Sequence, residues 1–474
     1  MKELSYLKNT SYLILAGILS QIFAAVQKII LARYLKEEGM AIYQSALLVY
    51  SLFLTLACGG IPIAVTHFIS GARAKGESRN ILSALSFALL ITFCCGLLLS
   101  LMMFFTRTFF SIAMKEPLAE YAIAALSPSV FIVAVGAVAK SCFEGHSNMY
   151  PCAISQVSEA IIKLILAYIF TSFFSIFSAR YTAFGGALAI TCGEAFATAL
   201  LFAFFYPFIK EIRALHINAD RKIRTALLSY ALPVTAYAII LSSLDLLENA
   251  VIRNSLLAIK FTEISAERLF LRYSRYTSAF DTLIKSRRLT LKGASWLYGA
   301  FFGYALTIIR FPAGLLRTLS VSFFPIASKS FAEKNTAAVS KALSQAVKVI
   351  LLISMPTGAI ITIFGRQITS LIFSSSAYYT MLVSAVPILI LSPLCSILAT
   401  AEYAGGVTFV PFSISLFEFV ISIPLCFILV RIPLININGA AIASSVGLLA
   451  ELFLHLFFLS RRLKVCVSFF PARR

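Results

Sequence analysis

The sequence has few charged residues. Asp, Glu, Lys and Arg make up 13% of its 474 residues, whereas hydrophobic residues make up 60% and the mean hydropathy is +0.91. An ordinary globular protein is about a quarter charged and about half apolar. This composition excludes a soluble domain of this length and predicts a polytopic membrane protein.

The sequence also lacks the motifs of common catalytic and metal-binding sites. It contains no HExxH, no GxSxG and no phosphate-binding loop, and its nine cysteines include no CxxC pair. Most of the cysteines lie inside apolar runs, where a thiol acts as a small packing residue. We therefore expect no catalytic residues, no metal site and no cofactor apart from H⁺ or Na⁺ as a coupling ion.

Acidic residues are scarce: the sequence has 20 Asp and Glu and 40 Lys and Arg, which gives a formal net charge of +20. In a soluble protein this excess would suggest nucleic acid as a ligand. No stretch of basic residues with interleaved aromatics typical of nucleic-acid binding occurs, so we expect no nucleic-acid partner. In a membrane protein the excess reflects topology and anionic lipid headgroups.

Long apolar runs dominate the sequence. The stretch from Ala41 to Ala72 carries no Asp, Glu, Lys or Arg, and a helix of that length, at about 1.5 Å per residue, exceeds a hydrocarbon core of about 30 Å. The N-terminus is interpreted as a first span rather than a signal peptide, because no small-residue cleavage site follows it. Apolar runs bounded by charged loops predict twelve spans, at residues 10–32, 41–70, 81–105, 119–143, 150–177, 182–208, 226–252, 293–327, 339–365, 377–401, 408–430 and 437–460.

Three groups of residues recur in the same order along the chain. Pro62-Ile63-Ala64 returns as Pro325-Ile326-Ala327, 263 residues later. The other two groups return at offsets of about 260 and 253 residues; they are Pro151, Ile154, Ser155 and Glu159 with Pro411, Ile414, Ser415 and Glu418, and residues 184–189 with 437–443. A repeat of six spans keeps its orientation, so a pseudo-two-fold axis along the membrane normal is expected.

The predicted fold is all-α, with two six-helix lobes. The N-terminal lobe covers residues 1–215 and the C-terminal lobe covers 216–474, with a basic insertion at 254–292. With the N-terminus inside, the inner loops carry twenty Lys and Arg. The outer loops carry seven when the long segment at residues 253–292 is not counted. Both termini are therefore expected in the cytoplasm. The long segment from residue 253 to 292 carries nine basic residues on the outer side, and an amphipathic or interfacial helix is expected around residues 266–285.

Charged residues inside spans are informative, because a charge at the bilayer centre costs about 2.5–3.5 kcal/mol. Gln21 and Lys28 lie seven residues apart, on one face of the first helix, and Arg33 ends that helix. This face is predicted to line a central polar cavity in which Lys28 attracts an anion. The alternative is that Lys28 is ion-paired or reaches the membrane surface.

The eighth span carries a second pair of cations. Arg310 and Arg317 are again seven residues apart, beside Pro312 and Gly314. Two arginines on one helical face near a helix break predict an anion site of the size of a phosphate group.

Acidic residues in the spans allow two interpretations. Glu159 and Lys163 have the i,i+4 spacing of an intrahelical ion pair, although Glu159 is also a candidate for cation coupling. Asp245 and Glu248 lie one turn apart and precede Arg253; they predict either a proton or Na⁺ coupling site or hydrogen bonds to neighbouring helices and Arg253. For each remaining intramembrane ionisable residue, a packing role and a functional role are weighed equally. These residues are Glu194, Glu402, Glu418, Glu451 and His455.

Several motifs together resemble the stage V sporulation protein B family. They are Gly39-Met40, Tyr43-Gln44, residues 49–56 and 60–64, Gly145, Asn148-Met149, Pro151, Ser155-Gln156, Glu159, residues 232–235, Leu297-Tyr298-Gly299, residues 320–328 and residues 437–442. That family belongs to the multidrug/oligosaccharidyl-lipid/polysaccharide exporter superfamily. The resemblance covers nearly the whole chain. Gln21 and Lys28 stand where members of the family often have arginine, and many members have fourteen spans rather than twelve.

The resemblance implies a V-shaped cavity between two lobes and the flipping of an undecaprenyl-linked saccharide across the bacterial plasma membrane by alternating access. Lys28 and Arg310, with Arg33 and Arg253, would hold the pyrophosphate while the lipid tail stays in the bilayer. Two other functions stay open. One is a cation-coupled multidrug exporter that depends on Asp245 and Glu248, and the other is a scaffold that recruits envelope-synthesis enzymes.

Overall fold

Helices are the regular elements of this protein. The computed structural model describes residues 2–74, 78–146, 148–214, 221–274, 276–407, 409–465 and 467, and no β-strand occurs within these ranges. In that part of the chain eleven helical stretches are long and apolar enough to cross a membrane. The first, Leu15–Arg73, has 59 residues, and at about 1.5 Å per residue this is enough for two crossings. The predicted all-α membrane fold is confirmed.

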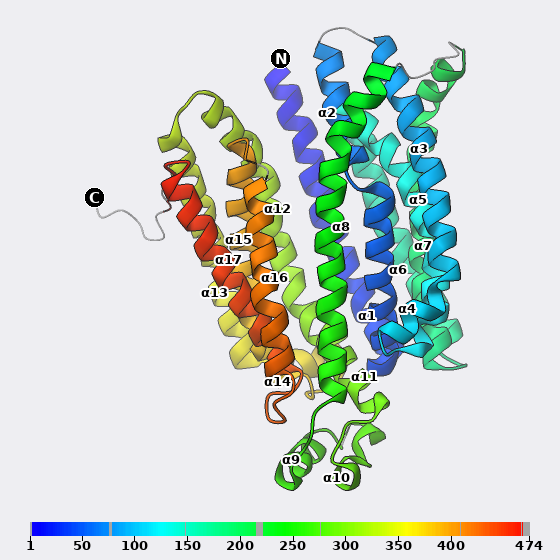
Figure 1. Cartoon of the computed structure of the whole chain (residues 1–474), viewed down its shortest axis with the longest axis vertical. Coiled ribbons are helices and arrows are strands. Elements are labelled where there is room, and N and C mark those ends of the chain that lie inside the picture. Colours follow the sequence, from blue (N-terminus) through cyan, green and yellow to red (C-terminus); the bar gives the residue numbers. More distant parts are fainter. Residues whose placement is uncertain are drawn as a thin grey trace. The chain divides into compact units, whose positions relative to one another are not determined.

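The first two predicted spans are two helices that meet at a sharp kink within the helical stretch Lys2–Cys58. Its backbone leaves the helical region at Lys36 (φ 54°, ψ −172°), where the chain turns back on itself (Figure 1). The helices of this part of the chain are α1 (Lys2–Cys58), α2 (Ile61–Ala74), α3 (Ser78–Phe105), α4 (Arg107–Ala113), α5 (Glu120–Gly145), α6 (Tyr150–Phe174), α7 (Ala179–Ala214) and α8 (Arg221–Leu257).

The second part of the chain has more helix interruptions. The predicted eighth span is α11, a π-helical turn at Ala300–Ala305 and α12 in one continuous run, and the tenth is α14 followed by α15. The helices are α9 (Glu263–Tyr273), α10 (Leu283–Ser286), α11 (Leu291–Gly299), α12 (Leu306–Ala332), α13 (Thr336–Phe373), α14 (Tyr379–Ser384), α15 (Val386–Ala404), α16 (Phe409–Leu429) and α17 (Asn438–Arg461).

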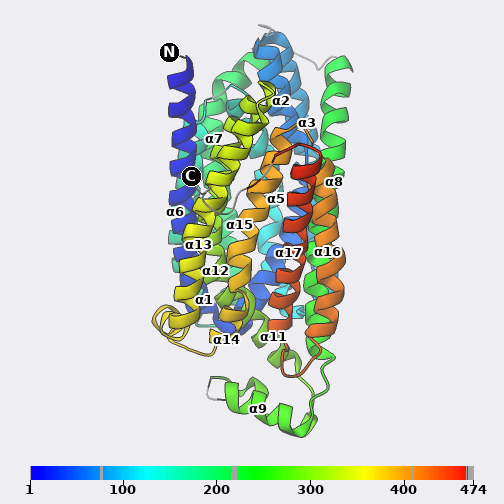
Figure 2. The same ribbon diagram turned by 90° about the vertical axis from the view of Figure 1, so that its left-hand side faces the viewer.

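The chain forms two compact units, Met1–Leu246 and Leu247–Arg474. In the N-terminal unit α5, α6 and α7 pack on α1, and part of the core lies between α2, α3, α5 and the start of α8. In the C-terminal unit α12, α13, α15 and α17 share an apolar core and run alongside one another (Figure 2). The seam at residues 215 and 216, which comes from the six-helix repeat, stays a prediction.

Two adjacent glycines permit close packing inside the N-terminal unit. Gly59 has a φ of +37°, which L side chains rarely adopt, and Gly60 begins the turn into α2. A Cβ atom on Gly60 would lie 2.3 Å from the carbonyl oxygen of Ala231 on α8. The Gly60 amide also donates a hydrogen bond to Thr235 Oγ1 at 2.8 Å. Backbone therefore meets backbone at this contact, and no side chain fits between.

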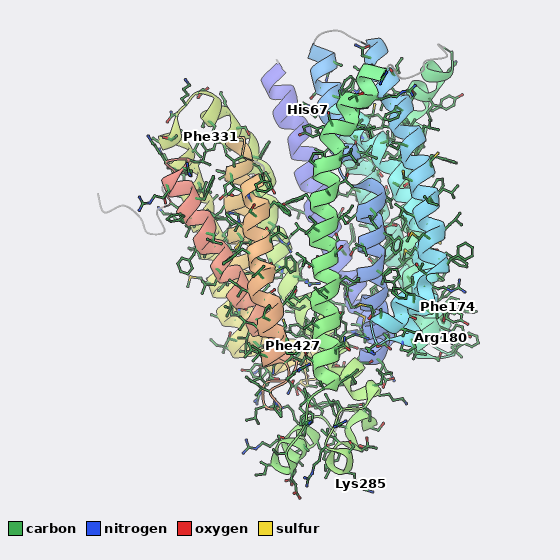
Figure 3. All side chains as sticks on the ribbon, viewed as in Figure 1. His67, Phe174, Arg180, Lys285, Phe331 and Phe427 are labelled. Atoms are coloured by element: carbon green, nitrogen blue, oxygen red, sulfur yellow. The ribbon has the colours of Figure 1, made fainter. Side chains whose placement is uncertain are left out.

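The basic segment between α8 and α11 forms two short helices instead of the single one expected around residues 266–285. α9 begins at the Thr262 cap and ends at Tyr273, and α10 ends where Arg287 adopts a φ of 51°. Tyr273 and Phe280 pack on Trp296, with ring centroids 4.9 and 5.5 Å away. The turn between the helices brings both rings onto one core, and burial raises the pKa of the Tyr273 hydroxyl above its usual range. Lys285 lies at the far end of the segment (Figure 3).

Replacement of Gly60 by alanine should destabilise the protein, because the new methyl group would collide with the Ala231 carbonyl. We expect a loss of about 1–3 kcal/mol, as overpacked cores show, measured by unfolding in detergent followed by circular dichroism. Gly71→Ala is the matched control, since nothing lies within 4 Å of its added Cβ. Equal stability of the two variants would contradict the close contact.

The aromatic core of the basic segment can be tested through Trp296, which is the only tryptophan and is 1% exposed. Tyr273→Ala should open the packing around the indole and make its fluorescence accessible to acrylamide, with quenching several-fold stronger than in the wild type. Tyr276→Ala is the control, because Tyr276 is 42% exposed and its hydroxyl contacts Ser376 at 3.1 Å. Unchanged quenching in Tyr273→Ala would show that Tyr273 does not cover the indole.

Candidate functional site in the N-terminal unit

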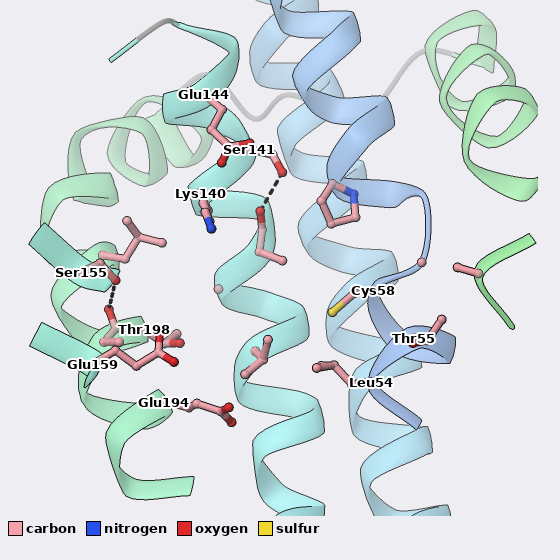
Figure 4. A pocket seen from close by; sticks show the side chains of 18 residues that line it. Leu54, Thr55, Cys58, Lys140, Ser141, Glu144, Ser155, Glu159, Glu194 and Thr198 are labelled. Carbon is pink, nitrogen blue, oxygen red and sulfur yellow. Dashed lines mark hydrogen bonds between the residues drawn. The ribbon is translucent and has the colours of Figure 1, made fainter. Parts of the chain in front are cut away.

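A cavity of about 530 Å³ lies within the N-terminal unit. Its walls come from α1, α2, α5, α6, α7 and α8 (Figure 4). Most of the lining is apolar, as is usual for a cavity between membrane-spanning helices. The charged residues among those that line it are Lys140 and Glu144 on α5, Glu159 on α6 and Glu194 on α7.

Lys163 joins two of these carboxylates. Its Nζ lies 2.7 Å from Glu159 Oε1 and 2.9 Å from Glu194 Oε1. The Tyr50 hydroxyl of α1 lies 3.0 Å from each oxygen of Glu194, which is 8% exposed. A buried charge is tolerated when it is paired and hydrogen-bonded. The Glu159–Lys163 ion pair predicted from the spacing is therefore confirmed, and Glu194 extends it to α7 and α1.

A glycine makes room for the lysine. A Cβ on Gly193 would lie 2.3 Å from Lys163 Cγ, so any larger residue would displace the lysine stem. The neighbouring backbone is fixed by Ser155, whose hydroxyl donates to the Ala197 carbonyl at 3.1 Å. Small residues on α7 thus allow α6 to approach closely enough for the ion pairs to form.

The balance of charge defines what the cavity can accept. Glu144, Glu159 and Glu194 carry three potential negative charges, against the ammonium groups of Lys140 and Lys163. A cavity whose charged groups include more carboxylates than ammonium groups suits a cation, a proton or a hydrogen-bonding group better than a pyrophosphate. Within the described residues no group of three His, Cys, Asp or Glu has metal-binding geometry.

The predicted substrate residues of α1 lie outside this cavity. Gln21 and Arg33 are exposed and Lys28 is half-buried, and none of the three lines the cavity. Gln27, next to Lys28, is 8% exposed. The helix face that carries Gln21 and Lys28 therefore does not contribute to the acidic cavity.

The predicted cations of the C-terminal unit have two different environments. Arg310 and Arg317 are exposed on α12. Arg253 is 3% exposed, and its guanidinium lies 4.2 Å from the centre of the Tyr298 ring. The Tyr298 hydroxyl donates to Asn249 Oδ1 at 2.7 Å. Arg253 is thus held by a cation–π contact at the junction of α8 and α11.

The predicted coupling carboxylates both lie on α8. Asp245 is exposed and Glu248 is half-buried. The Cys426 thiol on α16 lies 3.5 Å from Glu248 Oε1, which links α8 to α16. A role of Asp245, Glu248 and Glu159 in cation coupling stays a prediction.

Some residues of this site were not predicted from the sequence. Tyr50 and Glu194 lie 144 residues apart, and Lys163 and Glu194 are 31 apart. Sequence spacing says nothing about such contacts between helices. The one usable signal was energetic: a glutamate in an apolar span requires a cation or a hydrogen-bond donor within the membrane.

Removal of the central cation tests the cluster. Lys163→Met would leave the buried Glu194 and the half-buried Glu159 without their ammonium partner, and we expect a loss of stability of about 3–5 kcal/mol. The measurement is unfolding in detergent followed by circular dichroism. Lys163→Met combined with Glu194→Gln should recover most of the lost stability, because the buried carboxylate without a cationic partner is then absent. If the double variant is as unstable as the single one, the ion pair is not the reason for the loss.

Comparison with known proteins agrees with this fold. The family model described as polysaccharide biosynthesis protein matches residues 6–254, and the model described as lipid II flippase MurJ matches residues 277–472. In Bacillus subtilis, stage V sporulation protein B is 25% identical over 99% of this chain and 86% of its own length. The lipid II flippase MurJ of the same organism is 22% identical over 94% of this chain and 81% of its length.

Solved structures of low sequence identity share the architecture. An inward-facing multidrug resistance MATE family transporter of the MOP superfamily superimposes with a TM-score of 0.70 at 15% identity, over 94% of each chain. A MOP superfamily transporter from Pyrococcus furiosus gives a TM-score of 0.65 at 16% identity, over 97% of this chain and 95% of the other. These likenesses show the MOP fold, and the family match over more than half of the sequence shows that the chain belongs to the polysaccharide biosynthesis protein family.

Proposed function

We propose that this protein flips an undecaprenyl-linked oligosaccharide or cell-wall precursor across the bacterial plasma membrane by alternating access. The family match and the two Bacillus subtilis relatives, one of them named a lipid II flippase, support the proposal. The protein is a multi-pass membrane transporter rather than an enzyme. Its substrate would be amphiphilic, with a charged headgroup and a tail that stays in the lipid.

The observation that carries the proposal is the exposure of two arginines on a membrane-spanning helix. Arg310 and Arg317 lie on α12, and both side chains are exposed. An arginine facing hydrocarbon costs about 2.5–3.5 kcal/mol, so these side chains favour a polar, hydrated surface. A guanidinium binds phosphate oxygens through two parallel hydrogen bonds, which fits the pyrophosphate of such a lipid.

The other predicted cations extend this assignment. We assign Lys28 and Arg33 on α1 to the same phosphate groups and Gln21 to a polar contact with the headgroup. Arg253 is buried against Tyr298, so its contact with the substrate would require movement of that ring. The polyprenyl chain would remain in the bilayer throughout.

The excess of Lys and Arg in the inner loops supports a topology with both termini in the cytoplasm. Those basic loops would also offer contacts to enzymes of envelope synthesis. A labelling reaction confined to one side of the membrane, applied to cysteines introduced near each terminus, would test the topology.

A second function, cation-coupled export of drugs, is favoured by one observation. Glu144, Glu159 and Glu194 line the cavity of the N-terminal unit, and carboxylates attract cationic molecules. The coupling ion would be H⁺ or Na⁺, with Asp245 and Glu248 as further carboxylates. The two functions differ in their substrate, so a transport assay separates them.

Reconstitution into liposomes with a fluorescent polyprenyl-pyrophosphate saccharide tests the proposed function. The wild type should move the probe across the bilayer, and Lys28→Gln combined with Arg310→Gln should slow this by about tenfold or more, as the loss of charge-assisted hydrogen bonds predicts. Arg287→Gln combined with Arg288→Gln removes the same charge outside the spans and should leave the rate unchanged.

Equal rates in the wild type and the Lys28/Arg310 variant would refute the site assignment while leaving the function intact. If no polyprenyl-linked probe moves and an organic cation does, the protein is an exporter of the second kind.

A further inference from the structure

A second buried cluster of ionisable groups lies in the C-terminal unit. Glu402 is near the end of α15, and Glu451 and His455 are one turn apart on α17. His455 Nδ1 lies 2.9 Å from Glu402 Oε1, and His455 Nε2 lies 3.5 Å from Glu451 Oε1. Glu402 and His455 are 0% exposed and Glu451 is 9% exposed. An imidazole thus lies between two carboxylates in the apolar core.

The surroundings of this cluster are well defined. Ser415 on α16 donates to Glu451 Oε1 at 3.0 Å. Two other ionisable groups lie close by: the Cys395 thiol on α15 interacts with Glu451 and lies 3.4 Å from the Leu448 carbonyl, and Glu418 on α16 lies near Cys395. Ala401 and Leu452, which adjoin Glu402 and Glu451 in the sequence, belong to the same apolar core as Leu316 of α12 and Leu343 and Val347 of α13.

Two buried atoms of the cluster, Glu402 Oε2 and His455 Nε2, have no hydrogen-bond partner within the described residues. A charged carboxylate oxygen left in this state costs several kcal/mol, because no protein donor replaces its hydration. Protonation of the carboxyl group removes the charge.

A count of charge leads to the same conclusion. With both carboxylates ionised, the cluster has a charge of −2 when His455 is neutral and −1 when it is protonated. One proton beyond the imidazolium makes it neutral. Burial in a medium of low dielectric constant favours the neutral state, whereas contact with water favours release of that proton. The number of bound protons is therefore coupled to whether water reaches the cluster.

The internal repeat provides a comparison within the same chain. Gly193 on α7 matches Gly447 on α17 at an offset of 254 residues, and Ala197 matches Glu451 at the same offset. Ser155 donates to the Ala197 carbonyl, and Ser415 donates to the Glu451 carboxylate.

Both units therefore bury ionisable groups between helices, on α1, α6 and α7 in one unit and on α15 and α17 in the other, and the two cationic residues differ. One is a lysine, a residue type that in model peptides titrates near pH 10.4, and the other is a histidine, a residue type that titrates near pH 6.5.

We propose that Glu402, Glu451 and His455 form a proton-binding site, which holds one proton while the cluster is shielded from water and releases that proton when water reaches it. The proton is received by the Glu402 carboxyl group. Its binding changes the link between α15 and α17 from an ion pair to a hydrogen bond between the imidazolium of His455 and a neutral carboxyl group, and the remaining charge pair is His455 with Glu451. The site is independent of which molecule the protein transports.

Infrared difference spectroscopy on the protein in lipid nanodiscs tests the proposal directly. Between about pH 6 and about pH 9 ordinary carboxylates and lysines do not titrate, so a change in the band of protonated carboxyl groups reports perturbed carboxylates. We expect such a change in the wild type and its loss in Glu402→Gln. Glu159→Gln in the other unit is the matched control and should retain it.

Histidine NMR gives an independent measurement. The sequence has four histidines, so labelled imidazoles give few signals, and His455→Gln identifies the one from the cluster. That signal should change in the same pH range as the carboxyl band, and Glu402→Gln should alter its pH dependence. Glu451→Gln provides a second variant if His455→Gln does not fold.

A constant carboxyl band and a constant His455 signal across this range would overturn the proposal, as would a pH-dependent band that persists in both Glu402→Gln and Glu451→Gln.

Discussion

The structure depends on one constraint: a charge placed among apolar helices must find its partner there. Lipid offers neither water nor hydrogen bonds, so an unpaired glutamate or lysine would cost several kcal/mol. Lys163 meets this constraint by contacting Glu159 and Glu194 together, with Tyr50 donating to the second carboxylate. These contacts join α1, α6 and α7. Packing in the N-terminal unit is thus fixed by polar contacts as well as by apolar area.

The C-terminal unit meets the same constraint with different residues. Its imidazole lies between Glu402 and Glu451, and Ser415 connects the group to a third helix. The repeated glycines, Gly193 and Gly447, admit Lys163 and Glu418 respectively to the same position between helices. A duplicated framework thus carries a fixed cation in one half and a titratable group in the other. This asymmetry is what a transporter needs if one half only maintains its shape while the other responds to pH.

Much of the fold could be predicted from the sequence, because hydrophobic length and loop charge act locally. The spans follow from the length of apolar runs, the six-helix repeat from residue groups that recur at similar offsets, and the Glu159–Lys163 pair from spacing along one helix. Contacts between helices could not be predicted in this way: Glu194 with Tyr50, and His455 with Glu402, depend on how distant segments pack. The segment around residues 266–285 was expected to be one helix, but the ring centroids of Tyr273 and Phe280 lie 5.5 Å apart, closer than the rise of about 10 Å over seven residues of a continuous helix. The chain therefore turns between these two residues.

The segment between α8 and α11 has a practical consequence. In the first half of the repeat the corresponding connection is the tight turn at Lys36, whereas in the second half the same connection holds a folded insert with its own aromatic core. Loop length costs little free energy once the ends are fixed by their helices. This connection is therefore a natural point for grafting a rigid fusion partner, which would give a small membrane protein the extra mass that image alignment in electron microscopy requires.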